Sequence, residues 1–297
     1  MTNQAVGILG ATSLVGNCLL SPDRISDTAP HLGVFAFSRQ PVPSDWVIDD
    51  RLSWRCLTEQ SQQELEESID SWISLAPIWV LPDYFPLLER CGARRVVVLS
   101  STSVFTKADS PDAKDKDIAD RLALGEKQLI EWAENRGVDW IILRPTLIYG
   151  LGRDQNITSV AGFINRFGFF PLFGKAMGLR QPIHAKDVAV AALRVLMQTG
   201  IKNRAYNISG GETLSYRDMI GRVFMALKKK PRYLPIPSML LHSGVMLLRL
   251  LPGFKGVSSG MAERMNRDLV FDHSAAARDF GFNPRPFQLS EKDVGRC

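Results

Sequence analysis

The 297-residue sequence predicts an α/β protein in which a doubly wound parallel sheet is accompanied by a small C-terminal lobe. The chain opens on an apolar run that turns at a glycine and continues into a helical pattern, over residues 5–16. Short apolar runs then alternate with helical patterns up to residue 150, which is typical of a parallel sheet covered by helices on both faces. The content of 45% hydrophobic and 23% charged residues is that of an ordinary globular protein.

The predicted strands of the first half are short and mostly apolar. The clearest is 95–100, whose continuous β-branched run is typical of a strand buried on both faces. Arg144 and Pro145 are expected to end the last strand of this half. The remaining predicted strands cover residues 6–9, 33–38, 54–57, 72–76 and 139–143.

The predicted helices separate these strands. They begin at Leu14 and continue at 60–71, 78–91 and 118–135, with Gly92 and Gly137 as stops. The second half is less regular, with loops and one helix in 150–178, helices at 187–197 and 215–228, and a strand at 205–209. We therefore expect a core over 1–150, and over 151–297 a mixed segment that returns to the sheet and also forms the lobe.

The opening turn predicts a dinucleotide site. Gly10 permits the tight turn, Gly16 lets the helix pack close to the strand, and the helix directs its N-terminal amides toward a pyrophosphate. Ser13 replaces the middle glycine of the usual pattern, and the alternative is a βα turn that needs glycine only for its backbone angles. The predicted contacts are Gly7, Gly10, Thr12, Ser13, Leu14, Val15 and Gly16.

The composition argues against several classes of protein. Four cysteines and four histidines are dispersed along the chain, which favours free thiols in a reducing compartment and argues against a metal site. No stretch reaches the roughly 18 apolar residues of a membrane span, and the first residues lack a signal-peptide pattern. We therefore expect a cytoplasmic protein.

Charge is unevenly distributed along the chain. Residues 1–150 hold 14 Lys and Arg against 21 Asp and Glu, whereas 151–297 hold 22 against 10. A basic second half favours an anionic partner, such as a phosphorylated substrate, a nucleotide or an acidic membrane surface, and a solvated face without a ligand is the alternative. The basic run at 228–230 lacks interleaved aromatic residues, so no nucleic-acid partner is expected.

Six segments, taken in order, resemble one family. They are residues 10–16, 99–105, 143–150, 180–187, 206–211 and 280–285. Together they are similar to the extended or atypical short-chain dehydrogenases/reductases, the NAD(P)-dependent epimerase/dehydratase-like group. The resemblance covers nearly the whole chain and implies a Rossmann-type sheet, a nicotinamide coenzyme, and oxidoreductase or nucleotide-sugar epimerase or dehydratase chemistry.

The end of the second predicted strand favours NADP over NAD. Ser38 and Arg39 stand where a carboxylate would bind the ribose 2′-hydroxyl of NAD, and an arginine instead offers charged donors to a 2′-phosphate. A surface arginine without a ligand is the alternative. The resemblance adds Leu75, Ala76, Pro77, Ser100 and Pro145 to the expected coenzyme contacts.

The resemblance also implies a catalytic residue, Ser101, which would orient a substrate oxygen. Catalytic family members carry a tyrosine and, four residues later, a lysine on one helix face, and the matching positions here are Ile118 and Leu122. Neither side chain can transfer a proton. We therefore expect an NADP-preferring enzyme of this family with a non-standard proton donor, and the alternative is a non-catalytic NADP-binding redox sensor or assembly subunit.

The expected substrate side is less defined. Tyr149 and Arg180 are the predicted substrate-binding residues, and the resemblance implies that Arg180 grips a diphosphate. An arginine that caps a loop or pairs with Asp187 is the alternative. Tyr149, together with Asp154 and His184, is also a candidate proton donor, and a satisfied structural histidine is the favoured interpretation of His184.

The expected partners follow from the same reasoning. We expect a small-molecule substrate, phosphorylated or nucleotide-linked, with a homodimer and peripheral membrane contact as further options. The strongly apolar segment 238–251 could form a packed helix, a lid, a dimer face or a helix at a membrane surface.

Overall fold

A computed structural model of the chain describes residues 5–21, 33–42, 52–58, 67–110, 112–237 and 263–295. The apolar segment 238–251 lies outside these ranges, as does most of the helix predicted at 60–71. Within the described ranges, no helix combines the length and apolarity needed to cross a membrane.

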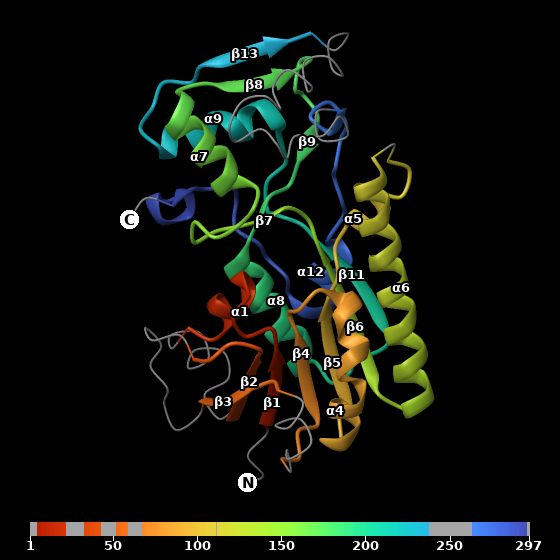
Figure 1. The fold of residues 1–297 in the computed structure, drawn as a ribbon. Helices are drawn as coiled ribbons and strands as arrows, with labels where there is room; N and C mark the ends of the chain where they lie inside the picture. Colours follow the sequence, from red (N-terminus) through yellow and green to blue (C-terminus); the bar gives the residue numbers. More distant parts are fainter. Residues whose placement is uncertain are drawn as a thin grey trace.

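The largest element of the described fold is a sheet of seven parallel strands, which runs across the lower half of Figure 1. The strand order is β11-β6-β5-β4-β1-β2-β3. Successive strands are added on one side of β1 as far as β3, and β4 then follows on the other side of β1. Such a reversal is the switch point of a doubly wound sheet, beyond which ligands bind at the carboxyl ends of the strands. The predicted fold class is confirmed. The strands are β1 (Ala5–Leu9), β2 (Gly33–Ser38), β3 (Leu52–Cys56), β4 (Ser71–Ser74), β5 (Arg95–Leu99), β6 (Asp139–Pro145) and β11 (Arg204–Ile208).

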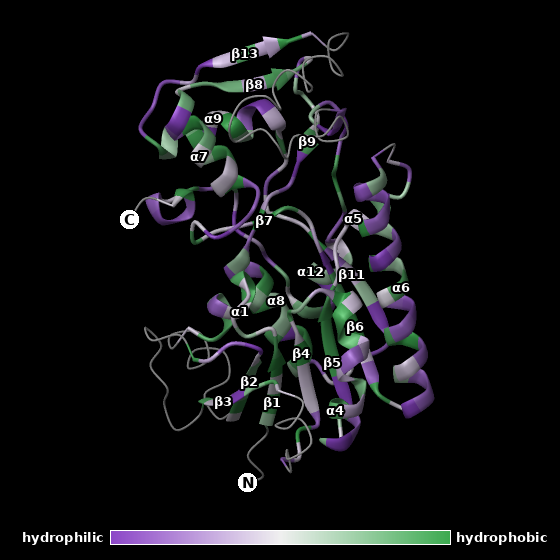
Figure 2. Cartoon of the chain, viewed as in Figure 1, coloured by the Kyte–Doolittle hydropathy of each residue, from purple (hydrophilic) through white to green (hydrophobic). Residues whose placement is uncertain are grey.

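Helices cover both faces of this sheet. On one face α1 (Leu14–Leu19) contacts α8 (Ala185–Met197), over a core that includes Val6 and Ile8. On the other face the sheet is covered by η1 (Ile78–Tyr84), α4 (Phe85–Arg90) and α6 (Ala113–Arg136), over a core centred on Trp72. Figure 2 shows hydrophilic residues along α6 and hydrophobic residues on the central strands, which is the pattern of a helix with one solvated face.

Two predicted helices differ from the observed ones in instructive ways. The helix predicted at 78–91 is a 3₁₀ segment, η1, followed by the short α4. Pro82 lies inside η1 and Pro86 in the first turn of α4, and each lacks the N–H that a continuous α-helix needs. The helix predicted at 118–135 begins earlier, because Asp112 accepts a hydrogen bond from the Lys114 N–H and caps it.

A second cluster of elements, here called the upper cluster, forms the upper part of Figure 1. Its helices are α7 (Ile157–Phe167) and α9 (Tyr216–Ala226), and Ser215 caps α9 as predicted. Its strand pairs are β8 (Phe170–Phe173) with β13 (Tyr233–Ile236), and β9 (Leu179–Arg180) with β12 (Leu214–Ser215). The one-turn η3 (Glu291–Val294) packs on α7 and α9. The strand β8 lies where only loops and a helix are predicted.

Elements of the second half return to the sheet between these segments. β7 (Ile148–Tyr149) pairs with β10 (Ile183–His184), and α8 follows directly and packs beneath β4 and β5. The buried Arg95 on β5 donates hydrogen bonds to the carbonyls of Val195, Leu196 and Gln198 at the end of α8. α12 (Ser274–Phe280) then packs beside β11.

Candidate functional site

The turn after β1 requires its two glycines for separate reasons. Gly10 has a φ of +80°, and a Cβ at this position would lie 2.7 Å from the backbone nitrogen of Ala76. A Cβ on Gly16 would collide with the carbonyl of Ala11. Ser13 caps α1 by accepting a 3.0 Å hydrogen bond from the Gly16 N–H. The backbone of this loop therefore comes closer to β4 and to any ligand than side chains would permit.

The cavity beside this turn, which we call the β2 cavity, has a volume of about 480 Å³. The Ser38 hydroxyl at the end of β2 accepts a 3.0 Å hydrogen bond from the Gln40 N–H and lies 3.4 Å from the Thr12 hydroxyl. Arg39 also lines the cavity, and its side chain is exposed. Eight predicted coenzyme contacts line this cavity: Gly10, Thr12, Ser13, Ser38, Arg39, Leu75, Ala76 and Pro77.

The next cavity, here named the serine cavity, has a volume of about 500 Å³ and adjoins the switch point. It shares Ser13 and the segment 75–77 with the β2 cavity, so the two adjoin along the loop after β4. Ser101 lines it together with Ile118 and Leu122, which lie one turn apart on α6. The structure thus brings together the predicted serine and the two apolar side chains that stand where a tyrosine and a lysine are expected.

The two serines after β5 have different roles. Ser101 accepts a 3.1 Å hydrogen bond from the Ser103 N–H, so its hydroxyl stabilises the start of α5 (Ser103–Thr106) and keeps its own proton for donation. Ser100 donates a 2.5 Å hydrogen bond to the buried Glu126. Arg144 also binds Glu126, through its Nε at 2.9 Å, and this ion pair fixes α6 against the end of β6.

A third cavity, the junction cavity, is lined by Ser100, Ser101 and Arg180 among others and has a volume of about 420 Å³. Lys107 and Arg264 line it, and both form ion pairs with the buried Asp115 of α6. Burial by itself would raise the pKa of Asp115, but these hydrogen-bonded cations hold the pKa below its ordinary value. This cluster was not expected from the sequence, because its members come from residues 107, 115 and 264 and show no local spacing.

Arg180, the predicted diphosphate ligand, lies between the junction cavity and the upper cluster. Its guanidinium donates to the carbonyls of Leu179 at 2.7 Å, Arg267 at 2.8 Å and Arg264. Burial lowers the pKa of Arg180 to about 10. Asp187, named as an alternative partner, instead forms an ion pair with Arg285 at 2.7 Å. The arginine therefore caps backbone carbonyls, as the loop-capping alternative expects.

The three candidate proton donors all have structural contacts. Asp154 accepts hydrogen bonds from the N–H groups at 156–158 and orders the start of α7. His184 caps α8 by accepting at Nδ1 from the Lys186 N–H, and its Nε2 lies 3.3 Å from Asp293. This geometry matches the interpretation of His184 as a satisfied structural histidine. Burial alone would raise the pKa of Asp293, but hydrogen bonds from His184 and Ser290 hold it well below its ordinary value.

Tyr149, predicted as a substrate contact, is fully buried. Its ring packs edge-on against His184 and Phe287, and its hydroxyl donates to the Gln288 carbonyl at 3.3 Å. Burial raises the pKa of Tyr149 to about 12. In this conformation the hydroxyl serves the packing of the upper cluster, and a substrate contact through it stays a prediction.

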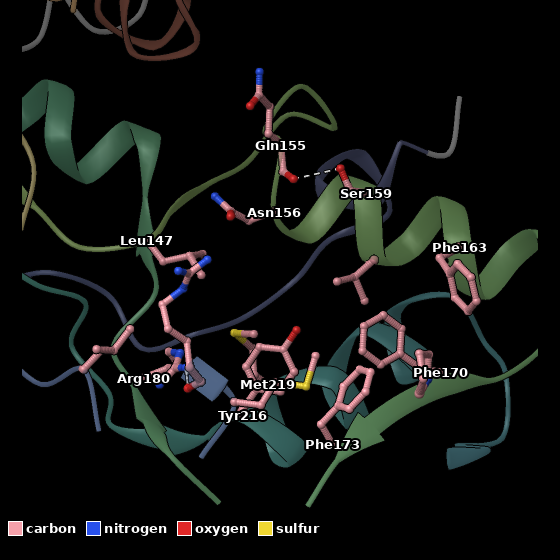
Figure 3. Close-up of a pocket in the computed structure, with 15 residues that line it drawn as sticks. Leu147, Gln155, Asn156, Ser159, Phe163, Phe170, Phe173, Arg180, Tyr216 and Met219 are labelled. Atoms are coloured by element: carbon pink, nitrogen blue, oxygen red, sulfur yellow. Dashed lines mark hydrogen bonds between the residues drawn. The ribbon is translucent and has the colours of Figure 1, made fainter. Parts of the chain in front are cut away.

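The fourth cavity, which we call the aromatic cavity, lies within the upper cluster and has a volume of about 310 Å³ (Figure 3). Figure 3 shows Phe163, Phe170 and Phe173 on the side of the cavity away from Arg180, while Tyr216 and Met219 lie beside the arginine, whose guanidinium is 5.5 Å from the centre of the Tyr216 ring. The sequence signal for this cavity is the run of phenylalanines in 163–173, a stretch for which loops and a helix are predicted. Its apolar wall is formed by Phe163, Phe170, Phe173, Tyr216 and Met219.

The strand order and the glycine turn define the class of this molecule as an α/β protein with a Rossmann-type doubly wound sheet. Residues 85–209 match the sequence model of the NAD dependent epimerase/dehydratase family, which confirms the family resemblance of the motifs. Within the described part of the chain, no group of three or more His, Cys, Asp or Glu is arranged to hold a metal ion.

Individual relatives agree with this assignment. UDP-glucose 4-epimerase of Vibrio cholerae is 22% identical over 209 residues, which cover 67% of this chain, and the chain spans 61% of that relative's length. The structure of UDP-glucuronic acid 4-epimerase from Bacillus cereus, in complex with NAD, matches at a TM-score of 0.71 and 14% identity, covering 99% of this chain and 96% of that one. The structure of RMD from Pseudomonas aeruginosa, complexed with NADPH, matches at a TM-score of 0.65 and 17% identity, covering 99% of this chain and 96% of that one. These similarities are of fold.

Proposed function

We propose that the chain is an NADP(H)-dependent oxidoreductase that reduces a carbonyl, or oxidises the corresponding alcohol, on a small molecule bound beside Ser101. The observation that carries this proposal is the pair of adjoining cavities, which joins the glycine turn and Arg39 at one end to Ser101 at the other. The NAD and NADPH named with the two matched structures agree with a nicotinamide coenzyme.

The residues present fit such a coenzyme. The glycine turn lets a pyrophosphate approach the backbone at the start of α1, where first-turn amides have no partner within the helix. The preference for NADP is supported by Arg39, an exposed cation on the wall of the β2 cavity at the end of β2. A guanidinium is attractive to a 2′-phosphate and offers it a planar set of donors.

The proposed chemistry needs few protein groups. When bound, NADPH supplies a hydride to the carbonyl carbon, and the resulting alkoxide takes a proton. Ser101 holds the substrate oxygen by donating its hydroxyl proton in a hydrogen bond. Because Ile118 and Leu122 replace the usual proton donor pair, we propose that water in the junction cavity supplies the proton, yielding the alcohol, NADP⁺ and hydroxide.

The test is a titration of the purified chain with NADPH and NADH, by calorimetry, on the unchanged chain and on Arg39→Glu. We expect tighter binding of NADPH, and a loss of about 10–100-fold in NADPH affinity for Arg39→Glu, since a charged hydrogen bond contributes about 1.5–3 kcal/mol. Arg232→Glu, an exposed arginine on the upper cluster, is the matched control with unchanged affinity. If NADPH and NADH bind with equal affinity to the unchanged chain, and NADPH binds Arg39→Glu as tightly as the unchanged chain, the assignment of Arg39 is contradicted.

A non-catalytic NADPH-binding protein is the second candidate. It is favoured by Ile118 and Leu122, which give the serine cavity an apolar wall where catalytic relatives need a proton donor. Oxidation of NADPH by the chain with any of a panel of aldehydes and ketones supports the enzyme. Tight NADPH binding without oxidation, together with a stable protein partner, supports the sensor or assembly subunit.

A further inference from the structure

The aromatic cavity has the wrong chemistry for a nucleoside diphosphate. Phe173 and Met219 on its wall are almost fully buried, and the rings of Phe163 and Phe170 pack edge-to-face at 5.7 Å. Ser159, one of its polar lining residues, already donates its hydroxyl to the Gln155 carbonyl at 2.7 Å. Most of the surface that a ligand would meet here is hydrocarbon, which favours apolar groups and penalises unpaired polar ones.

The cations at the entrance of this cavity are already occupied. Among the described residues that line the junction and aromatic cavities, the Lys and Arg side chains are Lys107, Arg180 and Arg264. Lys107 and Arg264 both pair with Asp115, while Arg180 donates to three backbone carbonyls. A diphosphate would have to break these contacts and leave buried carbonyls without donors, which costs free energy.

The size and position of the cavity define what it can hold. An apolar cavity of about 150 Å³ holds benzene, so about 310 Å³ has room for roughly ten carbons. The aromatic cavity shares Leu147, Asn156 and Leu269 with the junction cavity, which in turn shares Ser101 with the serine cavity. A molecule can therefore extend from the serine into the aromatic wall.

We propose that the aromatic cavity binds the hydrocarbon portion of the substrate, an aliphatic or ring group of about ten carbons, in place of a nucleoside diphosphate. The proposal rests on the proposed function in one respect, because the reacting oxygen of the same molecule lies at Ser101. It assigns the chain to substrates with a large apolar group and explains why Arg180 turns toward carbonyls.

The experiment measures the affinity of the whole chain for n-alkan-1-ols from butanol to tetradecanol, by calorimetry, with UDP and dTDP as the nucleotide probes. We expect affinity to rise about fourfold per methylene, as for transfer of a CH₂ group out of water, and to level off near ten carbons. UDP and dTDP are expected neither to bind at micromolar concentration nor to displace decanol. A flat alkanol series, or displacement of decanol by either nucleotide, would overturn the proposal.

Two variants localise the binding. Ser159→Trp places a large ring at the mouth of the cavity from an exposed helix position and is expected to flatten the alkanol series. Asn165→Trp, at an exposed position of the same helix away from the cavity lining, is the matched control that keeps the series. Met219→Ala enlarges the cavity and should move the plateau to longer alkanols by about two or three carbons.

The same samples are titrated with NADPH, which separates the two proposals. Retained chain-length dependence without NADPH binding contradicts the reductase and supports the cavity assignment. NADPH binding with a chain-length dependence unchanged by Ser159→Trp contradicts the cavity assignment and leaves the reductase intact.

Discussion

Arg264 and Asp115, which lie 149 positions apart in the chain, form an ion pair that joins the upper cluster, whose core includes the neighbouring Met265, to helix α6. Lys107 binds the other oxygen of the same carboxylate at 2.8 Å. The Asp115 side chain is almost fully buried, so the pair is not an ordinary surface contact. It positions one wall of the junction cavity against the helix that carries Ile118 and Leu122.

The first prediction concerns the acid stability of this contact. The folded-state pKa of Asp115 is lowered, so its contribution to the free energy of unfolding is present above the ordinary value of 3.8 and is lost as the pH falls below it. We expect Asp115→Asn to lower the free energy of unfolding by about 1–3 kcal/mol at pH 7, since the variant leaves two cations without their carboxylate. Denaturant unfolding at pH 7 and at pH 3 measures this, and the difference between the proteins should shrink at pH 3. A constant difference would show that packing, and not charge, is lost.

The second prediction separates a required glycine from a tolerated one. Gly10→Ala should lower the free energy of unfolding by about 1–3 kcal/mol. The alanine would have to keep a φ of +80°, and its Cβ would collide with the backbone of Ala76. Gly162→Ala on α7 is the control, since a Cβ there meets nothing within 4 Å. That change should stabilise the protein by about 0.5–1 kcal/mol. Thermal unfolding of both variants, with and without NADPH, checks the stabilities and the expected loss of binding in Gly10→Ala.

The third prediction introduces a tyrosine and a lysine at the two positions where the family resemblance implies them. Because Ile118 and Leu122 line the serine cavity with Ser101, the double change Ile118→Tyr with Leu122→Lys should raise the rate of carbonyl reduction. General acid catalysis contributes about 10²–10⁴-fold, and we expect the lower end in an unoptimised site. NADPH oxidation with a small aldehyde provides the measurement. Ile118→Tyr with Leu124→Lys, which puts the lysine at an exposed position, is the control and should show no comparable gain.

The fourth prediction concerns His184 as a structural residue. His184→Asn keeps a helix-capping side chain but removes one of the hydrogen-bond partners of Asp293, so we expect a loss of about 1–2 kcal/mol in the free energy of unfolding. NADPH binding and oxidation should be unchanged in the folded variant. A hundredfold loss of turnover at unaltered stability would instead identify His184 as the proton donor.

The sequence predicted the sheet well because local signals sufficed. The strand 33–38 has the observed bounds, and Gly137 ends the long helix in a left-handed conformation, as its lack of a Cβ permits. The helix at 78–91 was wrong as a single α-helix, although Pro82 and Pro86 were visible in the sequence. The apolar residues around the two prolines fit a helical pattern, and a pattern this short does not distinguish a 3₁₀ segment from an α-helix.

The site was predictable only where it follows the chain. The glycine turn, the end of β2 and the loop 75–77 meet in the β2 cavity because each follows a strand of the same sheet. Arg180 donates to the carbonyls of Arg264 and Arg267, which lie more than eighty residues further along the chain, so these contacts depend on the tertiary fold. Such contacts leave no periodic or compositional trace, so the sequence could not decide between a diphosphate ligand and a loop-capping arginine.

The order in which the chain visits its parts has a practical consequence. Within the described ranges, α7 and β8 belong to the upper cluster, α8 and β11 return to the sheet, and α9 then rejoins the cluster. A protease that cuts once between α7 and α8 would therefore leave two fragments that still interlock through both parts. Grafting the upper cluster onto another scaffold would require transplanting several separate pieces of sequence.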